Sequence, residues 1–134
     1  MRLLKPLQEI KVKFNLSYLS VSHDLNIISV LSNRIAVVYK GRLIEEAETM
    51  RIIGDPLHSY TKMSIKATTA AKKSKTLIND IENGIRSLET MKHQCVLFKK
   101  CDKHLTICSE KYPLEIEIDG RRVLCRLYSE RNRF

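Results

Sequence analysis

Four cysteines are gathered in the last 40 residues of this 134-residue chain, and their residue type and spacing indicate metal chemistry. They are Cys95, Cys101, Cys108 and Cys125, in the pattern C-x5-C-x6-C-x16-C. Four thiolates suit either zinc or an iron–sulfur cluster. The clustering favours one shared site over four separate buried thiols, although the pattern lacks the C-x2-C pairs usual in structural zinc sites. His93 and His104 are spare nitrogen donors, and we expect neither to be a ligand.

A single histidine, His23, stands directly after an apolar run, Leu16 to Ser22, that is rich in residues typical of strands. The near-continuous apolar character predicts a strand buried on both faces, as in a parallel sheet. Ligands of open α/β sheets bind outside the carboxyl ends of the strands, so His23 is a candidate ligand-facing residue. An imidazole there can donate a hydrogen bond to a phosphoryl oxygen. The alternative is a histidine with a purely structural hydrogen bond.

The rest of the chain reads as short helices and two hairpins that position these residues. Gly41 and the dipeptide Asp119-Gly120 are typical of hairpin turns. Residues 72–94 mix helical spacing with Asn83-Gly84 and are expected to be loop with some helix. The expected helices are residues 3–13, Leu25 to Leu31, Glu48 to Ile53 and Leu57 to Ala71, and the expected hairpin strands are Arg34 to Tyr39 with Arg42 to Glu46, and Leu114 to Ile118 with Arg122 to Leu127.

The net charge of +9 is concentrated at residues 62–75, which hold five lysines and no acidic residue. Such a stretch can attract phosphate groups of nucleic acid or lipid. We expect a solvated helix face instead, and the lack of aromatic residues in the stretch argues against nucleic acid. No apolar run approaches the roughly 20 residues of a membrane-spanning helix, and no signal peptide is evident. The cysteines are therefore expected to be reduced.

Three segments resemble a known family. SVSHDL, followed by SNRIAVVYKGRLIEE, looks like the late part of an ABC transporter ATP-binding subunit. DPLHSYT, from Asp55 to Thr61, resembles the segment found in ATP-binding subunits of oligopeptide and dipeptide importers. The resemblance implies an α/β fold: a partial P-loop-type ABC ATPase sheet, formed by the late strands and a hairpin, followed by a small cysteine-bearing carboxyl-terminal region.

The same resemblance implies roles for the candidate residues. His23 would be the switch histidine, which contacts the terminal phosphate of ATP. The four cysteines resemble a carboxyl-terminal motif that in some family members holds a [4Fe–4S] cluster, with zinc as the alternative here. Phe98 to Asp102 reads FKKCD where the family tends to have His-Pro-Arg-Cys-Pro, so this loop lacks the prolines of the family.

Several ATPase motifs do not occur in these 134 residues: no GxxxxGK[ST] loop, no LSGGQ-like segment and no Walker B acidic pair. We therefore expect no ATP hydrolysis by this chain alone, and ATP use only with an amino-terminal half, encoded separately or lost. The resemblance implies partners, namely membrane-spanning permease subunits and a second ATP-binding subunit. It also implies a place at the cytoplasmic face of the cell membrane.

The expected organisation has three parts. Residues 1–61 would be the carboxyl-terminal part of the ATPase core, residues 62–94 a connector, and residues 95–134 the cysteine region. The chain would then be a carboxyl-terminal fragment or degenerate copy of such a subunit, and a poor fold on its own. Two other interpretations stay open: a small adaptor or nucleic-acid-binding module that holds a metal through its four cysteines, and a non-catalytic regulatory partner of an intact subunit.

Overall fold

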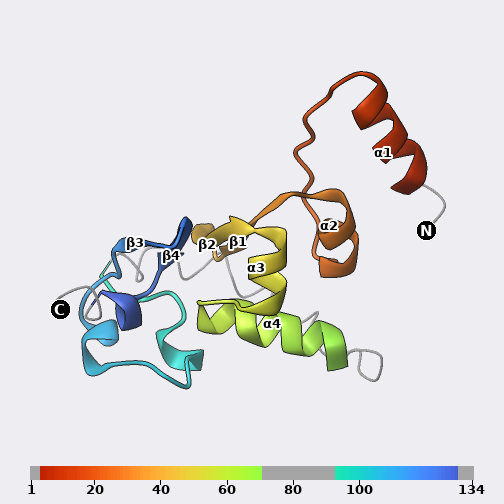
Figure 1. The fold of residues 1–134 in the computed structure, drawn as a ribbon. Helices are drawn as coiled ribbons and strands as arrows, with labels where there is room; N and C mark the ends of the chain where they lie inside the picture. Colours follow the sequence, from red (N-terminus) through yellow and green to blue (C-terminus); the bar gives the residue numbers. More distant parts are fainter. Residues whose placement is uncertain (1–3, 71–92, 130–134) are drawn as a thin grey trace.

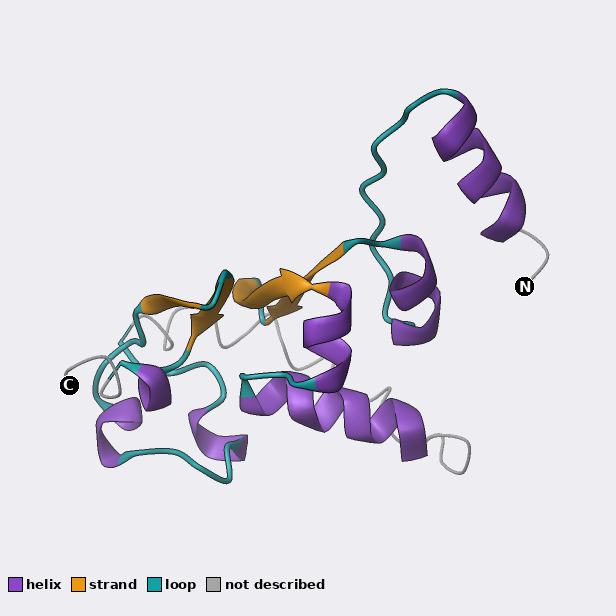
Figure 2. Ribbon diagram, in the orientation of Figure 1, coloured by secondary structure: helices purple, strands orange, loops and turns teal. Residues whose placement is uncertain are grey.

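The computed structural model describes residues 4–70 and 93–129, and it combines short helices with one small sheet (Figures 1 and 2). Within these two stretches, the four longer helices precede residue 71 and the three short 3-10 helices follow residue 93. The elements in chain order are α1 (Leu4–Lys13), α2 (Leu25–Leu31), β1 (Arg34–Tyr39), β2 (Arg42–Glu48), α3 (Thr49–Gly54), α4 (Ser59–Ala70), η3 (Phe98–Lys100), η4 (Thr106–Ser109), β3 (Glu115–Ile118), β4 (Arg121–Leu124) and η5 (Arg126–Tyr128).

The sheet has four strands in the order β1-β2-β4-β3, and every neighbouring pair is antiparallel. Two hairpins, β1–β2 and β3–β4, meet through their inner strands, where Glu45 lies opposite Val123 and Glu46 opposite Arg122. An isolated two-stranded hairpin is only marginally stable in water. The pairing of β2 with β4 therefore stabilises both hairpins, because it joins them into one four-stranded sheet. The sheet therefore unites residues from the first and the third of the three expected parts.

Both predicted hairpins are confirmed, and both turn at residues with positive φ. Lys40 and Gly41 have φ of 47° and 71°, and Asp119 and Gly120 have φ of 50° and 70°. Two successive residues with positive φ form the turn that matches the right-handed twist of the flanking strands. Local turn chemistry thus sets both hairpins.

A β-bulge interrupts the first hairpin. The register shifts between Val37, which pairs with Glu45, and Val38, which pairs with Leu43, so Ile44 has no partner. An extra residue in one strand breaks the alternation of side chains between the two faces. Ile44 and Glu45 are consequently both buried although they are adjacent, at 0% and 1% exposure.

Two apolar clusters pack against the sheet. The first links α2, β1, β2 and α3 through Ile28, Ile35, Ala47 and Ile52. The second links β2 and β4 to the cysteine region through Ile44, Leu124 and Val96. Tyr39 and Tyr60, whose ring centroids are 4.3 Å apart, lie beside the second cluster. Helices α2 and α3 and the loop around Val96 are therefore held to one sheet.

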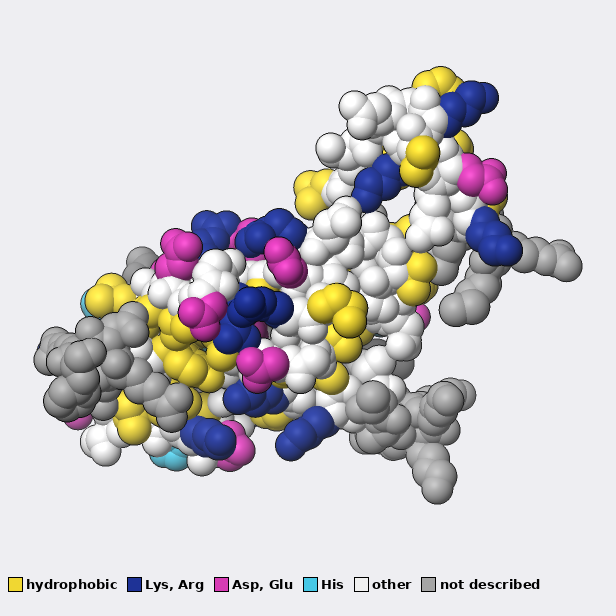
Figure 3. Space-filling model, in the orientation of Figure 1, with side chains coloured by type: hydrophobic (Ala, Val, Ile, Leu, Met, Phe, Trp, Pro, Cys, Tyr) yellow, Lys and Arg dark blue, Asp and Glu magenta, His cyan; other side chains and the backbone are white. Residues whose placement is uncertain are grey.

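Charged side chains of both signs gather over part of the surface, as Figure 3 shows. Glu46 of β2 pairs with Arg34 of β1, at 3.1 Å, and with Arg122 of β4. Arg122 reaches Glu115 of β3 at 3.9 Å, so the ion pairs cross all four strands. Because exposed pairs contribute little each, they help fix the strand order more than they add stability.

The predicted strand from Leu16 to Ser22 is wrong. The segment is an irregular, exposed loop, in which the side chains of Leu19 and Val21 are 97% and 95% exposed. A strand needs a neighbour to take its backbone hydrogen bonds, and no described strand lies beside this loop. The expected parallel sheet is likewise not found among the described strands, which pair only in antiparallel fashion.

The first helix, α1, stands apart from the sheet at the end of this loop (Figure 1). Two polar contacts tie it back to the body: Gln8 donates to the carbonyl of Val30 at 3.2 Å, and Lys11 to Asn33 Oδ1 at 2.9 Å. Neither of the described stretches contains a helix that is long and apolar enough to cross a membrane.

The other predictions of secondary structure hold with small changes at the ends. Helix α4 begins at Ser59 and not at Leu57, because the N–H groups of Leu57 and His58 bind a side chain of the sheet. Strand β4 ends at Leu124, where the expected strand ran to Leu127, and η5 follows it. Most of the expected loop at residues 72–94 lies outside the described residues.

Candidate functional site

His23 lies in the exposed loop, directly before α2. Asp24 caps that helix, since its Oδ1 accepts from the N–H of Asn26 at 2.9 Å, and Ser22 Oγ accepts from the N–H of Asp24 at 3.0 Å. The predicted position before a helix is therefore correct, and the predicted strand end is not. The imidazole is open to solvent, where a partner molecule can reach it.

The four cysteines, by contrast, come together around one small pocket. Cys95 lies before η3 and Cys101 directly after it, Cys108 lies within η4, and Cys125 directly follows β4. All are free thiols, and the cavity holds about 20 Å³, room for one water-sized or ion-sized guest. The pocket is also lined by His58, Ser59 and Arg126, and by Leu97, Phe98, Lys103, His104 and Leu127.

Backbone hydrogen bonds hold the cysteine-bearing loops in place. The N–H of Cys95 donates to the carbonyl of Cys108 at 2.9 Å, which joins two loops directly. The carbonyl of Cys125 accepts from the N–H of Tyr128 at 3.3 Å, within the turn that forms η5. The thiol of Cys101 donates to Ser59 Oγ at 3.4 Å, which fixes this loop to the start of α4.

Burial controls the protonation of these thiols. It raises the pKa of Cys125 from 9.0 to about 11, and it raises the pKa of Cys95 as well. Both side chains are consequently protonated at neutral pH. A metal that binds here must displace these protons, which makes binding dependent on pH.

Thiols are typical ligands of zinc and of iron–sulfur clusters, and all four cysteines line one pocket. The four cysteine side chains, however, are not arranged as the ligands around a bound metal are. Within residues 4–70 and 93–129, no three His, Cys, Asp or Glu side chains converge on one point as metal ligands do. The sulfurs would have to move inward to bind one ion together.

Two buried residues of the DPLHSYT segment, His58 and Ser59, form part of the wall of this pocket, a role that the sequence did not reveal. The carboxylate of Glu45 accepts from the N–H of Leu57 at 2.6 Å and from that of His58 at 2.9 Å. Arg121 of β4 pairs with Asp55 at 3.1 Å, and Tyr128 donates to the carbonyl of Leu57 at 2.9 Å. The segment is thus held by both hairpins and by η5.

Sequence reasoning missed Glu45 and Arg121. Glu45 is one of three glutamates in β2, and only the bulge decides which of them turns inward. Arg121 is one of two adjacent arginines in β4, of which Arg122 faces solvent. The alternation of faces along a strand is the signal that separates the two arginines.

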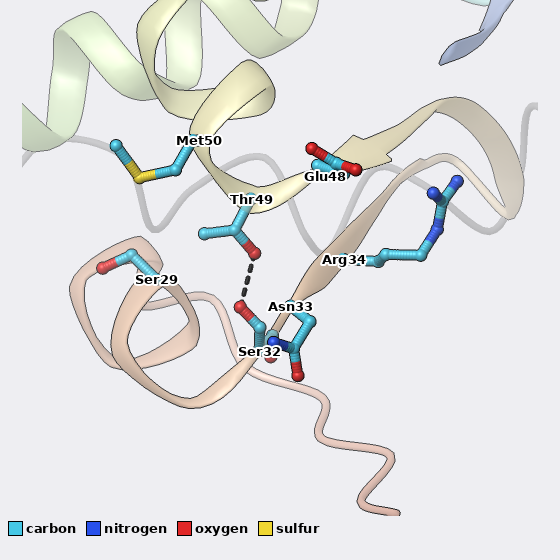
Figure 4. Close-up of a pocket in the computed structure, with 7 residues that line it drawn as sticks. All are labelled: Ser29, Ser32, Asn33, Arg34, Glu48, Thr49 and Met50. Atoms are coloured by element: carbon cyan, nitrogen blue, oxygen red, sulfur yellow. Dashed lines mark hydrogen bonds between the residues drawn. The ribbon is translucent and has the colours of Figure 1, made fainter. Parts of the chain in front are cut away.

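A second, shallower groove lies between α2, β1 and the start of α3 (Figure 4). Two of its polar side chains already have partners within the fold. Thr49 Oγ1 donates to the carbonyl of Ser32 at 2.5 Å, and Arg34 pairs with Glu46. Neither a cysteine nor His23 lines this groove, so it joins elements of the fold and does not extend the cysteine pocket.

Most of β2, helices α3 and α4, the DPLHSYT segment and the first three cysteines lie within a match to a known family. Residues 44–108 match the family described as oligopeptide/dipeptide transporter, C-terminal region. The chain therefore matches the carboxyl-terminal part of the oligopeptide/dipeptide-type ABC transporter ATP-binding subunits.

Individual relatives align along nearly the whole chain. It is 30% identical to the dipeptide transport ATP-binding protein DppD of Caldanaerobacter subterraneus over 129 residues, 96% of this chain and 40% of that protein. It is 32% identical to a peptide import ATP-binding protein of Brucella abortus, over 94% of this chain and 36% of that one. It is 28% identical to the oligopeptide transport ATP-binding protein AppF of Bacillus subtilis, over 92% of this chain and 39% of that protein. The chain spans about two fifths of the length of these relatives.

Proposed function

We propose that the chain acts as the carboxyl-terminal part of an ATP-binding subunit in a peptide importer. The observation that carries the proposal is the alignment of 96% of the chain with a dipeptide transport ATP-binding protein. Such a subunit would couple ATP hydrolysis to peptide uptake at the cytoplasmic face of the membrane. Its partners would be membrane-spanning permease subunits, a second ATP-binding subunit and an ATP-binding core that carries the phosphate-cradling loop.

In this role His23 would supply one contact to ATP. An N–H of its imidazole would donate to the terminal phosphate, on which negative charge grows in the transition state. The exposed position of His23 beside the start of α2 supports the proposal, because ATP held on the core can then approach the ring. A single donor neither binds nor hydrolyses ATP, so activity would depend on the core.

The cysteines would form a structural centre in the same subunit. We propose that Cys95, Cys101, Cys108 and Cys125 hold zinc or a [4Fe–4S] cluster. When bound, the group would tie together the four segments that carry the cysteines. The pocket that they share supports this proposal, and its small volume favours a single ion over a cluster.

The proposal is tested by supplying the core. The chain would be co-expressed with the ATP-binding core of the dipeptide transport ATP-binding protein with which it aligns, and the two would be purified through a tag on the core alone. We expect a soluble complex that hydrolyses ATP, whereas the chain alone releases no phosphate. If the chain does not co-purify with a folded core, or if it hydrolyses ATP unaided, the proposed function is wrong.

A further inference from the structure

Cys95 and Cys108 are neighbours in the cysteine pocket, because their backbones are hydrogen-bonded to each other. The N–H of Cys95 donates to the carbonyl oxygen of Cys108 at 2.9 Å. Residues joined by such a bond in paired strands have Cα atoms about 5.5 Å apart, within the roughly 4.4–6.8 Å that a disulfide spans. Both side chains line one cavity of about 20 Å³. The backbone therefore holds the two residues at a separation that suits a disulfide.

The other two cysteines of the pocket are held differently. The thiol of Cys101 donates to Ser59 Oγ at 3.4 Å. Cys125 directly follows β4, and its carbonyl oxygen accepts from the N–H of Tyr128. Within residues 93–129, no other two cysteines are joined by a backbone hydrogen bond. The fold thus singles out one pair among the four free thiols.

The two thiols of this pair differ in exposure. Cys95 is partly exposed, whereas Cys108, within η4, is only 6% exposed. A small disulfide in solution can therefore reach the sulfur of Cys95, while Cys108 supplies the buried second thiol. This arrangement favours a bond within the chain over a lasting bond to a small thiol.

We propose that Cys95 and Cys108 form a reversible disulfide, which makes the pocket a redox-sensitive switch. Glutathione disulfide is the oxidant. The sulfur of Cys95 attacks it, which forms a mixed disulfide and releases one glutathione, and the sulfur of Cys108 then attacks the Cys95 sulfur and releases the second. The two thiol protons end on the two glutathione molecules, so the chain loses two electrons and glutathione disulfide gains them.

The switch gives these cysteines a use that requires no metal. A disulfide needs two thiols at the right separation, and it does not need three or four side chains that converge on one point. The bond would close the loop of residues 95–108, which contains η3, onto η4. Because the bond uses two of the four sulfurs, it and the metal site proposed above exclude each other. The inference goes beyond the proposed function and stands without it.

The experiment maps the disulfide in the full chain, purified with a chelator and equilibrated with reduced and oxidised glutathione at a series of ratios. Trypsin places each cysteine in a peptide of its own: residues 93–99, 101–103, 104–111 and 123–126. As oxidised glutathione rises, we expect the free thiols to fall from four to two per chain and peptide 93–99 to become linked to peptide 104–111. The absence of this link at every ratio, or links from peptide 93–99 spread evenly over the other three, would overturn the inference.

Two comparisons test whether the fold directs the pairing. Cys95→Ser and Cys108→Ser should each abolish the link, while the matched change Cys101→Ser should retain it. In urea, loop-closure entropy favours cysteines that are close in sequence, so pairs that include Cys101 should replace the link between Cys95 and Cys108. An equal yield of that link in the folded and the urea-unfolded chain would contradict the inference.

Adding Zn²⁺ to the reduced chain separates the inference from the metal site. If the link forms in the chelated chain and the reduced chain binds no Zn²⁺, the metal site fails and the inference stands. If Zn²⁺ binds and no ratio of glutathione links the two peptides, the metal site stands and the inference fails.

Discussion

The carboxylate of Glu45 accepts a hydrogen bond from the backbone N–H of His58 at 2.9 Å, with both residues buried. The contact joins the centre of the sheet to the wall of the cysteine pocket. It exists because the bulge at Ile44 turns Glu45 inward. The position of His58 in the pocket thus depends on a register shift in the first hairpin.

Replacing Glu45 by alanine should destabilise the fold. The change leaves the N–H groups of Leu57 and His58 buried and without their acceptor, which costs about 3 kcal/mol in the free energy of unfolding. Urea unfolding followed by circular dichroism would measure this loss. The matched control is Glu48→Ala at an exposed position of the same strand, expected to change stability by less than about 0.5 kcal/mol. Equal effects of the two changes would show that Glu45 is not the anchor of this segment.

Acid should weaken the fold through His58. Burial lowers its pKa from 6.5 to about 4, so between these values the unfolded chain binds more protons than the folded chain. Stability is therefore fully present above about pH 6.5 and falls as the pH is lowered toward 4, by about 2 kcal/mol at pH 5. Urea unfolding at a series of pH values, with wild type and His58→Gln compared, isolates this contribution. A parallel pH dependence of the two proteins would contradict the prediction.

Each of the four cysteines should contribute to one metal centre. Anaerobic purification should give either stoichiometric zinc or the brown colour of an iron–sulfur cluster. Any single Cys→Ser change should reduce the metal affinity by more than the roughly 10–100-fold loss typical of changes outside the ligand shell. Ser109→Ala, next to Cys108 but not lining the pocket, is the control. Metal analysis that finds neither iron nor zinc would exclude the shared site.

The local parts of this structure were predictable, and the non-local parts were not. Lys40-Gly41 and Asp119-Gly120 encode turns within a few residues, so both hairpins could be read from the sequence. The pairing of β2 with β4 joins residues far apart in the chain, and no local pattern marks it. The four cysteines line one pocket, and the shared metal site that their clustering indicated stays a prediction.

The error at Leu16 to Ser22 has a physical cause. Apolar and β-branched residues favour a strand only where a neighbouring strand takes their backbone hydrogen bonds, and propensity alone cannot supply that neighbour. His58 and Glu45 were overlooked for a different reason. Their roles come from burial and from partners in other elements, which neither residue type nor spacing reveals.

The exposed loop should make the isolated chain associate. Leu19 and Val21 present almost their whole side chains to water. Leu19→Asp or Val21→Asp should raise the monomer fraction in size-exclusion chromatography, because charge blocks apolar association. Ser20→Asp adds the same charge without removing an apolar side chain, and should help less. A monodisperse wild-type monomer would contradict this expectation.

The role of His23 is decided by the rate of ATP hydrolysis of the complex between this chain and an ATP-binding core, with His23 changed to alanine. Loss of a hydrogen-bond donor to the developing charge should lower the rate about 10²–10³-fold. His93→Ala, a change of the same residue type at another exposed position, should leave the rate unchanged. A His23→Ala complex that hydrolyses ATP at the wild-type rate would contradict the account.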